Sequence, residues 1–154
     1  MNTRLKDAIS ACIPVMAVVK RLDFKVGKGG LADIDFAMQL IQIREGGARP
    51  EFRIQGTRRL LLGLPATRFL TEGEASELCA AHRFLRSLEL MVRMDSDTST
   101  SWIPADPQTL GPLAVRLGFA RPGAGDAFLA QYRTLTTRVR EIYLDVVERL
   151  MTAD

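Results

Sequence analysis

Two aspartates separated by one residue, Asp33 and Asp35, are the first group that could do chemistry. On a strand, such a pair would point to one face and could hold a divalent metal ion. On a helix, the two side chains would lie about 200° apart, since each residue adds roughly 100°. The pair follows three glycines directly and opens a segment with helical apolar spacing. We therefore predict a helix without a self-contained metal site, with the acidic groups complementing the helix dipole.

The segment just before this pair reads KVGKGG and is the second candidate. Its glycines, Gly27, Gly29 and Gly30, favour a loop over a helix or a strand. A glycine-rich loop before a helix can present N–H groups to an anion, and Lys25 and Lys28 would add positive charge. The phosphate-binding pattern GxxxxGK[ST] and the fingerprint GxGxxG are both absent. Spacing alone favours a plain tight connection over a phosphate cradle, and both interpretations stay open.

Other catalytic constellations lack the residues that they require. His82 is the only histidine, and we expect it to be a partly exposed residue in the middle of a helix. Cys12 and Cys79 lie among apolar or small residues and show no zinc-binding spacing. We therefore predict two reduced thiols, no structural zinc, no nucleophile–histidine catalysis and a cytoplasmic location.

The composition is that of one globular domain of 154 residues, with 47% hydrophobic and 25% charged residues. The net charge of +3 is modest, and no basic stripe interleaved with aromatic residues is present, so we expect no nucleic-acid partner. The arginines are scattered, and we expect most of them on solvated faces. They include Arg44, Arg49, Arg53, Arg58, Arg59, Arg68, Arg83 and Arg86.

The amino-terminal segment, residues 1–24, resembles a secretion signal only superficially. An apolar run from Ala8 to Val19 follows Arg4 and Lys6, but Asp7 interrupts the charged start and no small-residue cleavage site follows. The run is too short to span a bilayer, so we expect no membrane association. Pro14 would kink or restart a helix there.

Residues 25–154 are predicted to form the helical bundle itself. The first helix begins near Leu31 and ends at Gly46-Gly47, with one apolar stripe formed by Leu31, Ile34, Met38 and Ile41. A second apolar set widens this stripe and predicts that the helix is buried on more than one side. It comprises Phe36, Leu40 and Ile43.

Four further helices follow from apolar spacing and from start and stop residues. Thr57–Leu64 is short and ends at Pro65, whereas the next helix starts at a capping box formed by Thr71 and Glu74 and runs to about Met94. Asp106-Pro107 starts another helix, which Gly118 ends, and the last helix covers about 126–151. No alternating strand pair is visible, and Trp102 is expected to pack over one end of the bundle. We therefore predict an all-α, antiparallel bundle of five or six helices, two of them long.

The block FKVGKGGLADIDFAMQLIQI, residues 24–43, resembles the segment that opens the helical domain of glutamine synthetase adenylyltransferases. PII uridylyltransferases share a weaker version of it. Later segments of the chain resemble the same domain in the same order, so that the resemblance extends from about Leu22 to Val147. They are Phe84-Leu85-Arg86 with Leu88-Glu89, Ile103-Pro104, Leu113–Phe119 and Arg138-Val139-Arg140.

The chain also departs from this family in three respects. Asp35 stands where the family more often has Glu, and the residues after Glu89 lack the usual His and Gln. The family's catalytic domain precedes this block and carries a Gly-Ser turn and a strand-borne aspartate pair. The roughly twenty residues before the block match neither feature, so we expect no nucleotidyl transfer by this chain alone.

The resemblance implies a helical, noncatalytic part of a system that transfers AMP from ATP to glutamine synthetase in nitrogen regulation. The complete module would use ATP and magnesium, and this chain alone would bind neither. The implied partners are a nucleotidyltransferase catalytic domain and glutamine synthetase. The loop with Lys25, Gly27, Lys28, Gly29 and Gly30, followed by Asp33 and Asp35, would face phosphate or the catalytic domain. The alternative is a standalone helical bundle that binds other proteins without nucleotide chemistry.

Overall fold

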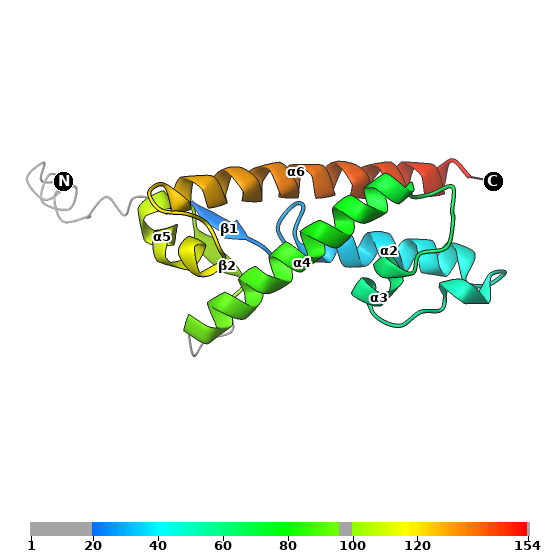
Figure 1. The fold of residues 1–154 in the computed structure, drawn as a ribbon. Coiled ribbons are helices and arrows are strands. Elements are labelled where there is room, and N and C mark those ends of the chain that lie inside the picture. The colour runs from blue at the N-terminus through cyan, green and yellow to red at the C-terminus, as the bar shows by residue number, and fades with distance from the viewer. Residues whose placement is uncertain (1–19, 96–99, 154) are drawn as a thin grey trace, which may run out of the picture.

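The computed structural model describes residues 20–95 and 100–153 (Figure 1). This part of the chain is mostly helical and contains only one small two-stranded sheet, which confirms the all-α prediction. The two predicted long helices are present as α4 and α6. The elements in chain order are β1 (Arg21–Asp23), α2 (Leu31–Glu45), the 3-10 turn η1 (Pro50–Phe52), α3 (Thr57–Leu62), α4 (Glu72–Asp95), β2 (Trp102–Pro104), α5 (Pro107–Arg116) and α6 (Ala124–Met151).

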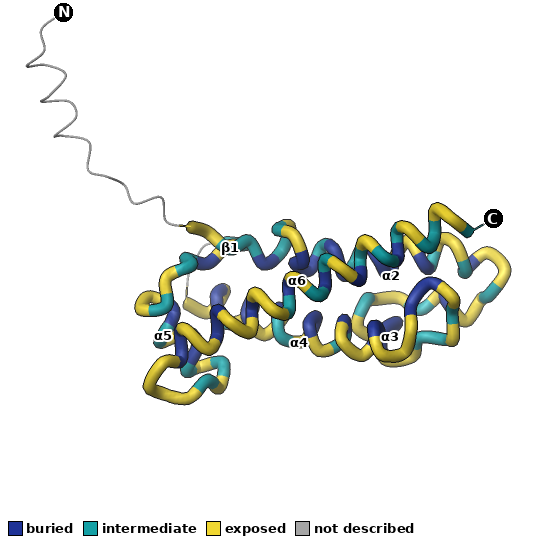
Figure 2. The backbone as a smooth tube through the Cα atoms, turned by 90° about the horizontal axis from the view of Figure 1, so that it is seen from above, coloured by how far each residue is buried: buried dark blue, intermediate teal, exposed yellow. Residues whose placement is uncertain are grey.

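Helix α6 runs along the whole length of the described structure (Figure 1). It packs against α5, α2 and α4. Helix α5 and the small sheet lie at one end of α6, α2 and α3 lie at the other, and α4 crosses obliquely between them. Buried positions recur along each helix (Figure 2), and their apolar side chains form one core between the helices. Fully buried members include Ile34, Ile41, Leu78, Leu85 and Phe128.

The predicted helix starts are confirmed where capping residues defined them. The backbone N–H of Thr71 donates to the Glu74 carboxylate at 2.9 Å, and the Glu74 N–H donates to the Thr71 hydroxyl at 3.2 Å. The Asp106 carboxylate accepts the backbone N–H of Thr109 at 2.8 Å. Helix α3 is two residues shorter than predicted, because it ends at Leu62 and Gly63 caps it.

The expectation that α2 is buried on more than one side is wrong. Its stripe around Ile34 and Ile41 is buried, but the second apolar set is exposed to 53% at Phe36, 36% at Leu40 and 78% at Ile43. Apolar residues on both sides of a helix predict burial only if neighbours cover both sides. In the described structure α3, α4 and α6 pack around the remaining faces of α2 and leave this one open.

The two strands were missed, because each contains three residues and shows no readable alternation. They pair antiparallel with Leu22 opposite Ile103, and the Phe24 N–H extends the pairing to the Ser101 carbonyl at 3.0 Å. This pairing fixes the start of the glycine-rich loop. The Trp102 ring lies under the Arg21 guanidinium, which is 4.1 Å from the ring centroid, and the ring is 36% exposed.

Two expectations concern residues outside the described part of the chain. They are the kink or restart of a helix at Pro14 and the reduced thiol of Cys12. Cys79 is a half-buried free thiol on α4. None of the helices described in the structure combines the length and the apolar character that crossing a bilayer requires.

Candidate functional site

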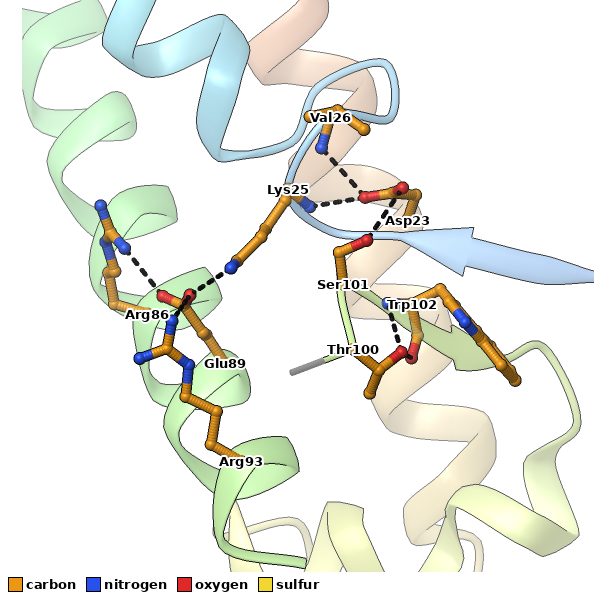
Figure 3. A network of polar contacts seen from close by, with 9 residues as sticks. All are labelled: Asp23, Lys25, Val26, Arg86, Glu89, Arg93, Thr100, Ser101 and Trp102. Carbon is orange, nitrogen blue, oxygen red and sulfur yellow. Dashed lines mark hydrogen bonds and ion pairs between the residues drawn. The ribbon is translucent and has the colours of Figure 1, made fainter. Parts of the chain in front are cut away.

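The glycine-rich loop between β1 and α2 is held largely by its own backbone. The Asp23 carboxylate accepts the N–H groups of Lys25 and Val26, both at 2.9 Å (Figure 3). The Gly30 N–H donates to the Gly27 carbonyl at 2.9 Å, and the N–H groups of the first α2 residues return to carbonyls of the loop. The N–H groups of Lys25, Val26, Gly29 and Gly30 therefore already have partners inside the chain.

Two of the loop glycines allow close approach of backbones. Gly29 adopts a φ of +74°, and a Cβ there would overlap the carbonyl oxygen of Thr136 on α6. A Cβ at Gly27 would overlap the carbonyl oxygen of Asp23. The loop is thus seated directly on α6, which gives these glycines a structural role whatever ligand the loop faces.

The aspartate pair lies in the first turns of α2, as predicted, and its carboxylates have separate partners. Asp33 is buried, accepts the Gly29 N–H at 2.6 Å and pairs with Arg140 of α6 at 3.2 Å. Asp35 is half-buried and accepts the Thr57 hydroxyl of α3 at 2.5 Å. The Asp33 carboxylate therefore links α2 to α6, and the Asp35 carboxylate links α2 to α3. Among the described residues, no three His, Cys, Asp or Glu side chains gather as metal ligands would.

Lys25 takes part in a cluster that sequence reasoning missed (Figure 3). Its ammonium lies 2.9 Å from the carboxylate of Glu89, a buried residue of α4. Two arginines of the same helix reach this carboxylate as well, Arg86 at 2.7 Å and Arg93 at 3.1 Å. The sequence offers one indication of this cluster. Glu89 follows Leu88 at the edge of the apolar stripe of its helix, where a charge without a partner would be unfavourable, so a cation should lie nearby.

The cations keep this buried carboxylate charged. Burial alone would raise the pKa of Glu89, but the bonds from Lys25 and Arg86 outweigh burial and lower its pKa. The Lys25 side chain is 30% exposed, and those of Arg86 and Arg93 are about half exposed. Lys28, the other lysine of the loop, is exposed.

His82 lies one turn before Arg86 on α4 and is buried, so the expectation of partial exposure is wrong. The residue sits on the inner side of α4, on the same apolar stripe as Leu78 and Leu85. Burial lowers the pKa of His82, the charges of Arg86 and Arg58 lower it further, and the carboxylate of Asp35 acts in the opposite direction.

Comparisons with known proteins identify relatives of this chain. Residues 15–147 match the family model described as GlnD PII-uridylyltransferase. The bifunctional glutamine synthetase adenylyltransferase/adenylyl-removing enzyme of Bordetella pertussis is 35% identical over 75% of this chain. The enzymes of the same name from Methylococcus capsulatus and Burkholderia mallei are 34% and 37% identical over 86% and 72% of the chain.

This chain spans only a small part of those relatives, 12% of the first and third and 14% of the second. Residues 15–147, which the family model matches, include the glycine-rich loop, α2, α4 and most of α6. The family model covers well over half of the chain. The chain therefore belongs to the family that the GlnD PII-uridylyltransferase model describes, and the relatives named above are glutamine synthetase adenylyltransferases.

Proposed function

We propose that this chain is a helical, noncatalytic unit of a glutamine synthetase adenylyltransferase/adenylyl-removing system. It acts together with a nucleotidyltransferase catalytic domain that transfers AMP from ATP to glutamine synthetase. ATP and magnesium belong to the complete module, and the catalytic domain supplies the residues that hold the metal ion. The system works in the cytoplasm, in nitrogen regulation, without a nucleic-acid or membrane partner.

The aspartate pair carries this proposal. A transferase that places a metal ion between two aspartates needs both carboxylates on one side. Here Asp33 is held by Arg140 on α6 and Asp35 by Thr57 on α3. These contacts support a structural role for the pair in joining α2 to its neighbours, with the chemistry provided by another domain.

The surface that faces the catalytic domain is the glycine-rich loop together with the open side of α2. Lys28 is exposed on the loop, and Phe36, Leu40 and Ile43 form an apolar stripe along the helix that follows it. A contiguous exposed apolar stripe beside charged groups is typical of a protein interface. The same stripe also favours the second candidate, a helical bundle that binds another protein without nucleotide chemistry.

The test combines the chain with a separately purified catalytic domain, ATP, magnesium and glutamine synthetase. We expect the two proteins to co-elute and labelled AMP to reach glutamine synthetase only when both are present. Phe36→Ser should weaken this complex, and Glu72→Ser, at an exposed position at the start of α4, is the matched control. AMP transfer by the pure chain, lost in Asp35→Asn, would contradict the proposal. Failure to bind the catalytic domain would favour the second candidate.

A further inference from the structure

We propose that Lys25, Arg86 and Arg93 form a binding site for phosphate groups on the surface that the loop shares with α4. This deepens the proposed function, on which it rests for the biological source of the phosphate. The site lies at the side of the glycine-rich loop that faces α4 (Figure 3). Its donors come from two segments far apart in sequence, which only the fold brings together.

The charge balance of the cluster is the first argument. Among the described residues, three cations converge on the single carboxylate of Glu89, so this group carries two positive charges in excess. The neighbouring carboxylate of Asp23 binds backbone N–H groups of the loop and the Ser101 hydroxyl at 3.3 Å. Three like charges repel one another unless further negative charge approaches, so the arrangement favours an anion.

The geometry of the donors is the second argument. Each guanidinium carries five N–H groups in a planar fork, and Arg86 and Arg93 each bring one nitrogen to Glu89 within salt-bridge distance. Both arginine side chains are about half exposed, so their remaining N–H groups can reach a ligand from solvent. Such forks match phosphate oxygens in pairs, and the lysine adds a point charge.

Glu89 fixes the positions of the cations before a ligand arrives. It is buried, and its carboxylate holds the three side chains within 2.7 to 3.1 Å. Donors that are already held in place lose less conformational freedom on binding than free surface side chains do.

The experiment is a titration of the full chain with inorganic tripolyphosphate at low salt, followed by NMR chemical shifts or calorimetry. We expect saturable binding with Kd on the order of millimolar. Arg86→Gln and Arg93→Gln should each weaken it about fivefold, because each removes one charge at the ligand. Each variant leaves two cations on Glu89, so the protein should stay folded, as circular dichroism would verify.

Arg138→Gln is the matched control. Arg138 is a similarly exposed arginine that pairs with Glu77 and Glu141 and not with Glu89, so its loss should not change binding. Equal weakening by Arg86→Gln and Arg138→Gln would show general attraction to positive charge and overturn the site. Absence of saturable binding would overturn it too.

Two further ligands, ATP and an acidic peptide, test whether the site recognises phosphate groups and which kind of molecule carries them. ATP that binds as tightly as tripolyphosphate, with the same dependence on Arg86, would support recognition through the phosphates. Preference for an acidic peptide over both would contradict the phosphate assignment. The proposed function is tested separately: if the catalytic domain does not bind but tripolyphosphate does, only that function fails. If AMP transfer is supported but no phosphate binds, only the present inference fails.

Discussion

Buried carboxylates in this protein each meet a cation from a distant part of the chain. Asp33 of α2 meets Arg140 of α6, and Glu74 of α4 meets Arg149 of α6. A buried charge without a partner is strongly unfavourable, so only an arrangement of the helices that brings these pairs together is stable. The pairs therefore help to fix how α2 and α4 sit on α6, beyond what apolar packing alone specifies.

The Glu74–Arg149 pair predicts an acid-sensitive contribution to stability. The bidentate hydrogen bonds from Arg149, at 2.7 and 2.9 Å, lower the pKa of Glu74 from 4.5 to about 2. A lowered carboxyl pKa stabilises the folded state above pH 4.5, and this contribution is lost as the pH falls from 4.5 through about 2. We expect Arg149→Met to lower the free energy of unfolding at pH 7 on the order of 2 kcal/mol, and much less at the lowest pH.

Urea unfolding of both proteins over this pH range measures the difference. Arg138→Met is the control, because Arg138 pairs with the exposed carboxylate of Glu77 and such surface pairs contribute little. An equal effect of Arg149→Met at neutral and at acid pH would contradict the assignment to Glu74.

The backbone conformation and close packing at Gly29 predict that any side chain there destabilises the fold. Its φ of +74° disfavours any residue with a Cβ, and that Cβ would overlap the Thr136 carbonyl on α6. We expect Gly29→Ala to lower the free energy of unfolding by several kcal/mol, roughly 3 or more, since strain and overlap add. Gly47→Ala is the control, because a Cβ there would meet no atom within 4 Å. Equal stability of the two variants, measured by chemical unfolding, would mean that the loop is not seated on α6 in this way.

Helix α2 carries apolar residues at both buried and exposed positions, so the effect of burial can be measured within one helix. Ile34 and Ile43 are the same residue type in the same helix, but Ile34 is fully buried and Ile43 is 78% exposed. We expect Ile34→Ala to cost about 2 to 5 kcal/mol of unfolding free energy, and Ile43→Ala to change it by less than about 0.5. Chemical unfolding measures both variants. A loss at Ile43 comparable to that at Ile34 would show that the open face is covered in solution.

The sequence predicts the helix starts well, but it predicts neither the open face of α2 nor the two strands. Capping residues are local, so Thr71 with Glu74 and Asp106 defined their helix starts correctly. The open face of α2 could not be predicted, because apolar spacing reports which residues avoid water in the complete assembly and not which neighbours are present. The strands were too short for their period to show, and the pairing of Leu22 with Ile103 depends on contacts between distant segments.

Within the candidate site, sequence reasoning placed Asp33 and Asp35 correctly on a helix, because the helical period is a local property. It could not find the cluster around Glu89, whose members Lys25 and Arg93 are far apart in the chain. It also placed His82 too near the surface, since burial of α4 depends on how α3 and α6 cross it.

At the scale of the whole molecule, α6 joins the two ends of the structure. Its first half packs on α5, and its length also contacts α2 and α4, so one continuous core extends between the ends (Figure 1). A single core predicts one cooperative unfolding transition. The chain offers an internal probe, because its one tryptophan, Trp102, lies in β2 at the α5 end, whereas most helical residues lie elsewhere.

We therefore expect the urea unfolding curve from Trp102 fluorescence to coincide with the curve from far-UV circular dichroism, which helix should dominate. Val146→Ala in α6, at a fully buried position far along the chain from Trp102, should move both curves by the same amount, corresponding to about 1 to 2.5 kcal/mol. The two signals respond together only if the ends of α6 unfold together. A fluorescence transition at lower urea, unaffected by Val146→Ala, would mean that the α5 end is a separate folding unit and that α6 does not couple the two ends.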